Sequence, residues 1–270
     1  MIVDPDRVGR VIAEVAETEI AARFGKLKEG DIETKTGPSD FVTEADRAAE
    51  AKLKTAFRDI YPGAVFVGEE SVADDPGLVD AIDDDGAFWI VDPLDGTRNF
   101  VQGRPEFGTI VALVDKGEIR AGWIYAIPDR RMAVGARGDG AFWAGERLAP
   151  VPAFDGPMTG YRAIGNLMEP WKSDMIPRLR AGFETEPARC SAYVYIHLIR
   201  GASAFALYSR VHPWDHAAGV MMVREVGGEA TYLDTGAPYT PRPVQGRPLL
   251  VAGARDNWRG VRDQLIDAAQ

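Results

Sequence analysis

An apolar run that stops at a pair of acids constrains this chain more than any other feature. Residues 87–91, Ala-Phe-Trp-Ile-Val, have the apolar, β-branched and aromatic composition of a buried strand. The next residues, Asp-Pro-Leu-Asp-Gly-Thr at 92–97, place Asp92 and Asp95 three positions apart. A strand that ends in such a tight turn can direct both carboxylates and the carbonyl of Leu94 to one point, which suits a cation that prefers oxygen ligands.

Two other segments also place acids where an element is expected to end or begin. The apolar run 64–67 is followed by the adjacent acids Glu69 and Glu70, and Asp215 lies at the start of a predicted helix, where backbone amides also face an anion. A single acidic turn is most simply a solvated turn, and we interpret the aspartate run 83–85 in that way because no apolar strand precedes it. Three acidic ends, each flanked by glycine and apolar residues, are less simply explained as solvated turns.

The first half of the chain shows an α+β pattern. Asp4 and Pro5 are typical of a helix start, and Thr43 with Asp46 forms a variant of the capping box before a second helix that ends near residues 61–63. Strands are expected at 64–67, 87–91, 109–114 and 121–125, of which the last two are typical of consecutive antiparallel strands.

The second half alternates helices and strands as in α/β layers. The expected elements are a helix at about 191–200, a strand at 204–208, a helix at about 214–226 and a strand at 249–252. The Pro/Gly-rich stretch 150–160 is the best candidate for a junction. We therefore expect an N-terminal α+β half, 1–150, with the antiparallel sheet and most metal ligands, and a C-terminal α/β half, 151–270, that completes the active site in one continuous structural unit.

Charge and cysteine content exclude several classes of function. The chain has 31 basic and 41 acidic residues and a formal net charge of −10, so its surface should repel nucleic acid and anionic lipid, and metal cations are the more natural partners. Its single cysteine, Cys190, excludes an internal disulfide and agrees with a reducing compartment. The N-terminus lacks the pattern of a secretory signal, and no segment approaches about twenty uninterrupted apolar residues, so we expect a cytoplasmic protein.

Four ordered motifs resemble those of the inositol monophosphatase family. They are Lys-Thr-Gly-Pro-Ser-Asp-Phe-Val-Thr-Glu-Ala-Asp at 35–46, Gly-Glu-Glu-Ser at 68–71, Asp-Pro-Leu-Asp-Gly-Thr-Arg-Asn-Phe at 92–100 and Trp-Asp at 214–215, and together they span almost the whole chain. The resemblance implies a layered α/β/α/β/α fold in one continuous unit, often paired as a homodimer. It also implies Mg²⁺-dependent, lithium-sensitive hydrolysis of a small phosphate monoester.

The same resemblance implies a set of metal ligands. Glu69, Asp92 and the carbonyl of Leu94 would hold one Mg²⁺, while Asp92, Asp95 and Asp215 would hold a second. Two such cations clamp the phosphate oxygens, lower the pKa of a bound water and stabilise the leaving alkoxide, so that no covalent enzyme intermediate is needed.

Further residues receive catalytic roles by the resemblance. Asp46 and Thr97 match the family pair that helps to activate the attacking water, and the amides of Gly96 and Thr97 would receive a phosphate oxygen. Glu70 is expected nearby, as support for the ligands or for a third metal. Lys35 is expected on a loop beside the site, with a plain surface lysine as the alternative.

Some positions depart from the pattern of the inositol-cleaving members. Tyr208 stands where those members carry a glutamate that grips a sugar hydroxyl, and Arg-Cys-Ser-Ala at 189–192 replaces a smaller Gly-Thr-Ala-Ala segment. Specificity lies in contacts to the alcohol portion, so Arg189, Ser191 and Tyr208, beside Asp215, are the candidate substrate contacts. Arg189 and Tyr208 could recognise a carboxylated or amino-bearing leaving group.

Cys190 and His216 are residue types that often act in catalysis, but we assign neither a catalytic role. Cys190 has no accompanying histidine motif, so we expect it to pack beside the substrate pocket rather than to act as a nucleophile. His216 directly follows a predicted metal ligand, but neighbours on a helix point about 100° apart, so we expect it to face away from the site.

The first candidate substrate is inositol 1-phosphate or a similar polyol phosphate. Relatives with the same metal motifs cleave histidinol phosphate, fructose 1,6-bisphosphate and nucleotide 3′-phosphates, and the Arg-Asn-Phe ending at 98–100 is closer to the inositol and histidinol branches. Two other classes stay open, namely a non-catalytic or moonlighting regulator that binds protein partners and a structural metal-binding module. The intact set of acids, including Asp46, together with Thr97 favours catalysis.

Overall fold

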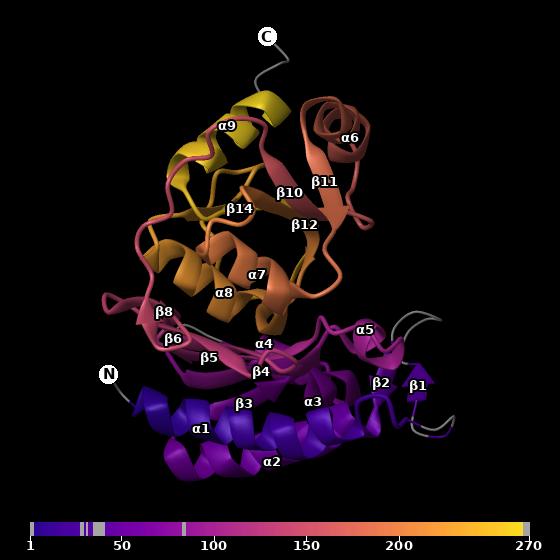
Figure 1. Ribbon diagram of the computed structural model, residues 1–270, viewed down its shortest axis with the longest axis vertical. Coiled ribbons are helices and arrows are strands. Elements are labelled where there is room, and N and C mark those ends of the chain that lie inside the picture. The colour runs from indigo at the N-terminus through magenta and orange to yellow at the C-terminus, as the bar shows by residue number, and fades with distance from the viewer. Residues whose placement is uncertain (1–2, 28–29, 31, 35–40, 83–84, 267–270) are drawn as a thin grey trace.

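The protein is built as five stacked layers. The computed structural model describes residues 3–27, 30, 32–34, 41–82 and 85–266. Figure 1 shows α1 (Pro5–Val15) and α2 (Glu44–Ile60) under a first sheet, α7 (Ser191–Ile199) and α8 (Pro213–Glu225) above it, then a second sheet, and finally α6 (Trp171–Gly182) with α9 (Arg255–Ile266). The expected α/β/α/β/α arrangement is therefore confirmed.

The first sheet has seven strands in the order β3-β4-β5-β6-β7-β8-β9. Their bounds are Val65–Gly68, Ala87–Asp95, Gly108–Asp115, Glu118–Ala126, Arg131–Ala136, Gly140–Trp143 and Glu146–Arg147. β3 runs parallel to β4, and every other neighbouring pair in this sheet is antiparallel. The strands predicted near 109–114 and 121–125 are β5 and β6, as expected.

The second sheet has five strands in the order β11-β10-β12-β14-β13. Their bounds, in chain order from β10 to β14, are Thr159–Ala163, Glu184–Pro187, Phe205–Val211, Glu229–Tyr232 and Val244–Ala252. β10 is parallel to both of its neighbours, whereas β14 is antiparallel to both of its own. The chain passes from the first sheet to the second through the coil between β9 and β10, which contains most of the Pro/Gly-rich stretch 150–160.

The remaining elements are short. α1 continues through a π-helical turn at Ala16–Ile20 and a 3₁₀ turn at Ala21–Arg23, and β1 (Ile32–Thr34) pairs with β2 (Phe41–Thr43) in a separate two-stranded sheet. The short helices α3 (Glu69–Asp74), α4 (Gly77–Asp80) and α5 (Thr97–Val101) follow strands or turns of the first half.

Local sequence explains how the two outer helices begin. Asp4 caps α1 by accepting from the amide of Asp6 at 3.0 Å, and Pro5 is the first helical residue. Thr43 caps α2, and its own amide donates to Oδ2 of Asp46 at 2.8 Å, which is the predicted capping box. Phe57 on α2 then stacks on Trp89 of β4 with ring centroids 4.4 Å apart, which fixes the helix against the sheet.

The middle layer is apolar on almost every side because it is covered by a sheet on both faces. α8 buries ten of its residues, from Pro213 to Val223, and α7 buries six. Asp215 is the acid in the first turn of α8, and Ser191 is the first residue of α7, so the N-terminal ends of both buried helices reach the cavity described below.

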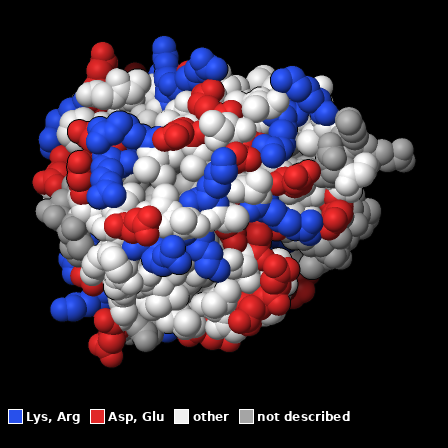
Figure 2. All heavy atoms as spheres, turned by 90° about the horizontal axis from the view of Figure 1, so that it is seen from below, with Lys and Arg blue, Asp and Glu red and all other residues white. Residues whose placement is uncertain are grey.

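The outer helical face has a mixed charge. Figure 2, which shows the molecule from below, has Lys and Arg interspersed with Asp and Glu over the layer of α1 and α2. None of the described helices is both long enough and apolar enough to cross a lipid bilayer.

Candidate active site

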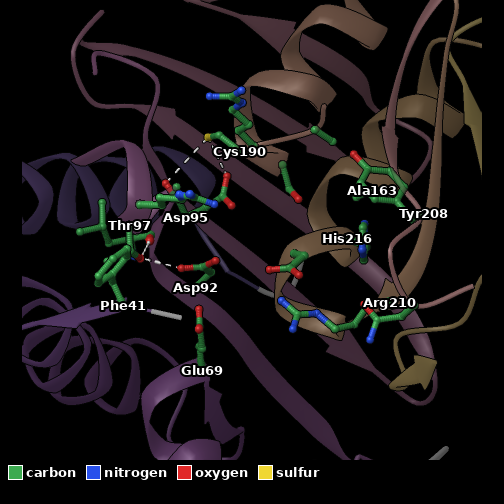
Figure 3. A pocket seen from close by; sticks show the side chains of 18 residues that line it. Phe41, Glu69, Asp92, Asp95, Thr97, Ala163, Cys190, Tyr208, Arg210 and His216 are labelled. Atoms are coloured by element: carbon green, nitrogen blue, oxygen red, sulfur yellow. Dashed lines mark hydrogen bonds between the residues drawn. The ribbon is translucent and has the colours of Figure 1, made fainter. Parts of the chain in front are cut away.

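A cavity of about 370 Å³ lies where elements from both sheets and from the middle layer end. In Figure 3, Glu69, Asp92 and Asp95 point into it from one side, while Tyr208, Arg210 and His216 form the opposite wall. The cavity therefore joins an acidic wall from the first half of the chain to a mixed wall from the second half.

Strand pairing brings two of the acids together. β3 and β4 are parallel, and Gly68 lies opposite Val91 in their register. Parallel strands end at the same edge of a sheet, so Glu69 and Asp92, the next residue of each segment, both emerge at the edge that lines the cavity. The predicted convergence of these two acids follows directly from this register.

The turn after Asp92 is held in shape by its own hydrogen bonds. The register between β4 and β5 shifts between Asp92 and Asp95, and this irregularity bends the strand end. The amide of Leu94 donates to Oδ1 of Asp92 at 3.0 Å, and Oγ1 of Thr109 donates to the carbonyl of Pro93 at 2.8 Å. Asp92 and Asp95 are thereby turned toward the same space.

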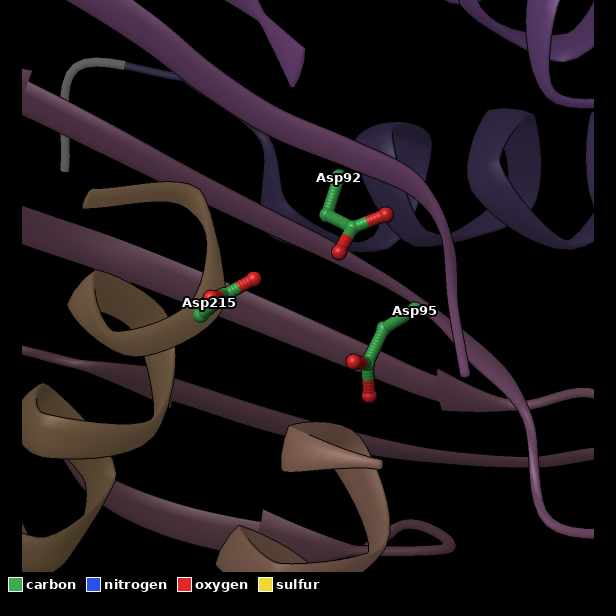
Figure 4. Close-up of side chains that lie close together, drawn as sticks. All are labelled: Asp92, Asp95 and Asp215. Atoms are coloured by element: carbon green, nitrogen blue, oxygen red, sulfur yellow. The ribbon is translucent and has the colours of Figure 1, made fainter. Parts of the chain in front are cut away.

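Asp215 completes an acidic cluster with these two residues. Asp92, Asp95 and Asp215 each offer one carboxylate oxygen, and the three atoms lie within 4.8 Å of one another (Figure 4). Carboxylate oxygens in this arrangement are the ligands that Mg²⁺ and Ca²⁺ prefer. The residues therefore fit a hard divalent cation.

The electrostatics of the cluster point the same way. Burial raises the pKa of Asp92 well above its ordinary value, and the nearby carboxylates of Glu69, Asp95 and Asp215 raise it further. Burial also raises the pKa of Asp95, although hydrogen bonds from the amide of Ala192 at 2.6 Å and from Sγ of Cys190 at 2.8 Å oppose this shift. A bound cation would remove the repulsion that the buried carboxylates otherwise experience.

The structure also brings together the predicted pair Asp46 and Thr97. Oγ1 of Thr97 lies 3.2 Å from Oδ1 of Asp46 and 2.8 Å from the carbonyl oxygen of Leu94. Oδ2 of Asp46 accepts from the amide and the hydroxyl of Thr43 at 2.8 and 2.6 Å. The N-terminal capping of α2 therefore fixes the carboxylate that lies beside the hydroxyl of Thr97.

Gly96 occupies a position that other residues cannot take without strain. Its φ is 82°, in the left-handed region, and an added Cβ would lie 2.8 Å from the carbonyl oxygen of Glu106 and 3.2 Å from Sγ of Cys190. The glycine lets the chain turn sharply from β4 into α5, and both Gly96 and Thr97 line the cavity.

Glu50 is a site residue that the sequence analysis missed. It lies on α2, is 4% exposed, and its carboxylate accepts from the amides of Glu70 at 2.9 Å and Ser71 at 2.8 Å. An added Cβ at Gly68 would lie 2.3 Å from an oxygen of Glu50, so the glycine makes room for this contact. Glu50 comes four residues after Asp46, one helical turn along the same face, and that spacing could have revealed it.

The other predicted residues are distributed as follows. Arg189, Ser191 and Tyr208 line the cavity, whereas Glu70 is buried and is not among the lining residues. Lys35 lies outside the described residues. The lining also includes Phe41, Arg98, Asn166 and Arg210, which received no role from the sequence. Of these, Arg210 lies two positions after Tyr208 on β12, and the register between β12 and β14 shifts between these two residues.

Cys190 and His216 had been assigned no role, with different outcomes. Cys190 is buried beside the cavity, and burial together with Asp95 raises the pKa of its thiol, so it stays protonated, in agreement with the packing interpretation. The expectation that His216 faces away was wrong, because the first turn of α8 ends at the cavity and two successive residues reach its wall. Burial lowers the pKa of His216 to about 3, and its Nδ1 lies 2.9 Å from Oη of Tyr195.

Comparisons with known proteins agree with this geometry. The sequence model of the inositol monophosphatase family matches residues 6–267. Nus factor SuhB of Escherichia coli K12 is 31% identical over 271 residues, which cover 97% of this chain and 94% of the relative. A fructose-1,6-bisphosphatase/inositol-1-monophosphatase of Thermotoga maritima is 32% identical over 206 residues, covering 74% of this chain and 75% of that protein.

A solved structure shows the same fold. The Thermotoga maritima IMPase superposes with a TM-score of 0.74 at 24% identity, covering 97% of this chain and 98% of the other. The layered fold and its acid-lined cavity are those of a phosphoric monoester hydrolase. The chain belongs to the inositol monophosphatase family, which confirms the resemblance drawn from its motifs.

Proposed function

We propose that this chain is a Mg²⁺-dependent phosphatase that hydrolyses a small phosphate monoester, with inositol 1-phosphate or a similar polyol phosphate as the first candidate. The observation that carries the proposal is the convergence of Asp92, Asp95 and Asp215, whose oxygen atoms lie within 4.8 Å of one another. Histidinol phosphate and fructose 1,6-bisphosphate are the alternative substrates.

The acidic wall would hold the metal. Asp92, Asp95 and Asp215 would bind one Mg²⁺, and Glu69 with Asp92 and the carbonyl of Leu94 would bind a second, since all of these residues line the same cavity. When bound, Mg²⁺ supplies Lewis-acid activation of water and neutralises charge on the phosphate and the leaving oxygen.

The remaining residues would orient the reactants. Asp46 would hold the hydroxyl of Thr97, 3.2 Å away, so that this hydroxyl positions the attacking water. The amides of Gly96 and Thr97 would receive a phosphate oxygen. Tyr208, on the opposite wall, and Arg189 and Ser191, which also line the cavity, would contact the alcohol portion of the substrate.

The proposal is tested by phosphate release from a panel of monoesters, with Mg²⁺ and after its removal by a chelator. The panel contains inositol 1-phosphate, histidinol phosphate, fructose 1,6-bisphosphate and a featureless aryl phosphate. Release that depends on Mg²⁺ and differs between alcohols supports the proposal. Release that survives exhaustive chelation, or none from any member, would contradict it.

The assembly and setting are also part of the proposal. The enzyme is proposed to be a cytoplasmic homodimer, by its family and by its single cysteine. Sedimentation velocity should then give twice the chain mass of 29.4 kDa. A single species at the monomer mass across the micromolar range would contradict the dimer.

A second role is favoured by one relative. Nus factor SuhB, at 31% identity, is named as a Nus factor and not as a phosphatase, so a regulatory interaction with a protein is the second candidate function. This regulatory role is tested by complementation of a strain that lacks the gene for this chain. Rescue by a variant without phosphatase activity, such as Asp92→Asn, would support the interaction role, and failure of that variant would leave catalysis as the function that matters.

A further inference from the structure

A second cavity, of about 730 Å³, adjoins the acidic one. The two share four lining residues, Arg98, Ala163, Ala188 and Arg189. The second cavity adds Arg104 and Arg162, and no Asp or Glu is among its lining residues in the part of the chain that the structure describes. An acidic cavity therefore opens beside one that carries four arginines, which we call the arginine pocket (Arg98, Arg104, Arg162 and Arg189).

The arginines of this pocket lack close ion pairs. Several other arginines, such as Arg120, Arg137 and Arg247, lie within 4.0 Å of a carboxylate. Among the described residues, none of the four pocket arginines has such a carboxylate. Four arginines without a close carboxylate partner therefore line one cavity of a chain whose net charge is −10.

Neutral groups hold one of these guanidinium groups in place. Arg162 is half-buried on β10, and its Nη1 donates to the carbonyl oxygen of Thr185 and, at 2.8 Å, to the hydroxyl of the same residue on β11. Neutral acceptors orient the guanidinium without cancelling its charge, and burial of a cation in this way is costly unless an anion joins it.

The four arginines come from separate parts of the fold. Arg98 lies on α5, Arg104 in the loop that follows, Arg162 on β10 and Arg189 in the loop before α7. Glu106 and Glu186 line a third cavity that shares Arg104 and Arg189, on the side of Tyr161 and His197. On its other side the arginine pocket shares Arg98 and Arg189 with the cavity that holds the acidic cluster.

We propose that the arginine pocket binds a second anionic group of the substrate while its phosphate ester lies against the acidic wall. The inference rests on the proposed phosphatase function. The substrate class is then a small metabolite with a phosphate monoester at one position and a phosphate or carboxylate at another. Guanidinium groups bind both anions through paired, charge-assisted hydrogen bonds, which gives the pocket both affinity and orientation.

The first test compares matched synthetic substrates. Butane-1,4-diol bisphosphate, 4-phosphooxybutanoate and 4-hydroxybutyl phosphate differ only in the distal group, which is a phosphate, a carboxylate or a hydroxyl, and two- and six-carbon homologues vary the span. We expect kcat/KM for at least one doubly anionic substrate to exceed that for the hydroxyl compound by about 10- to 100-fold. A higher rate for the bisphosphate or for the carboxylate identifies the anion that the pocket selects.

Variants assign the preference to the pocket. Arg104→Gln, at an exposed position, and the double variant Arg104→Gln/Arg162→Gln should reduce the ratio of kcat/KM for the doubly anionic substrate to kcat/KM for the hydroxyl compound by about tenfold or more. The control is Arg58→Gln/Arg259→Gln, which removes the same charge from exposed arginines of α2 and α9 and should keep the wild-type ratio. Equal kcat/KM for anionic and neutral substrates, or a ratio that the pocket variants leave unchanged, would overturn the inference while the phosphatase proposal stands.

A second measurement does not need turnover. In metal-free buffer with chelator, inorganic phosphate should show ³¹P line broadening with wild-type protein and with the Arg58→Gln/Arg259→Gln control, and none with Arg104→Gln/Arg162→Gln. The same broadening with all three proteins, or with none, would overturn the inference. If no substrate is hydrolysed at any Mg²⁺ concentration, the phosphatase proposal fails and this measurement still decides on the arginine pocket.

Discussion

Glu50 holds the amide of Ser71 at 2.8 Å, and this contact ties helix α2 to the first turn of α3, where the predicted ligand Glu69 lies. The same carboxylate also accepts from the amide of Glu70. A buried side chain outside the cavity lining thus positions the segment that carries the predicted metal ligand Glu69. Residues of this kind tune metal affinity through the ligands they support.

We expect Glu50→Ala to weaken the apparent Mg²⁺ affinity by about 10- to 100-fold. It should also lower the free energy of unfolding by about 1–3 kcal/mol, because the buried amide of Glu70 and the partly buried amide of Ser71 lose their acceptor. The measurement is initial rate against Mg²⁺ concentration, with Glu44→Gln, at an exposed position of the same helix, as the control. Lower stability with an unchanged Mg²⁺ dependence would show that Glu50 supports the fold alone.

His216 should shape the stability of the protein at acid pH. Its pKa is lowered from 6.5 to about 3 by burial, so the unfolded chain binds a proton there that the folded chain does not. The contribution of His216 to the free energy of unfolding is therefore fully present above pH 6.5 and is lost as the pH falls toward 3. At pH 4 the loss is about 3 kcal/mol.

The check is urea unfolding of the wild-type protein and of His216→Asn between pH 4 and pH 7.5. The variant should be less stable near neutral pH, because it loses the contact with Oη of Tyr195, but its stability should fall less steeply toward pH 4. Parallel curves for the two proteins would contradict a neutral, buried His216.

Other cations should not replace Mg²⁺ in turnover. Ca²⁺ takes longer bonds and more ligands than Mg²⁺, so we expect it to bind the acidic cluster and inhibit. Li⁺ at millimolar concentration should inhibit as well, as the family resemblance implies. The measurement is the rate with each cation alone and in competition with Mg²⁺. Equal rates with Ca²⁺ alone and with Mg²⁺ alone would refute the proposed ligand set.

Tyr208 and Arg189, which line the cavity, should control which alcohol is preferred. Tyr208→Phe and Arg189→Ala should reorder kcat/KM among inositol 1-phosphate, histidinol phosphate, fructose 1,6-bisphosphate and an aryl phosphate, by up to roughly tenfold for each lost hydrogen bond. Asp95→Asn, on the metal side, should weaken all four substrates. A uniform decrease for Tyr208→Phe and Arg189→Ala would mean that these residues support the scaffold and that selection occurs elsewhere.

Short-range sequence patterns predicted much of the fold and the acidic wall. The strand at 87–91, its acidic turn and the capping box of Thr43 and Asp46 are all encoded within a few residues, and the structure places them as expected. Contacts between distant segments were not predictable in this way. Arg162 lines the arginine pocket because β10 pairs with β11 and β12. No local pattern in the sequence fixes that pairing.

Glu50 and His216 could not be placed at the site from the sequence for the same physical reason. Glu50 is recognised as a site residue only when α3 is known to lie against α2, and His216 only when α8 is known to end at the cavity. The role of Lys35 and the division into halves at about residue 150 stay predictions.

The most direct test of the account is Mg²⁺-dependent phosphate release by Asp92→Asn, measured at saturating Mg²⁺ beside the wild type and an exposed control, Asp59→Asn. Asn keeps the shape of the side chain and removes the charge that both proposed metal positions share. We predict that release falls to the level of the uncatalysed reaction while the melting temperature in chelator stays the same or rises, because a buried, repelled carboxylate is gone. Turnover near that of the wild type would contradict the central claim that the Asp92 cluster holds the catalytic metal.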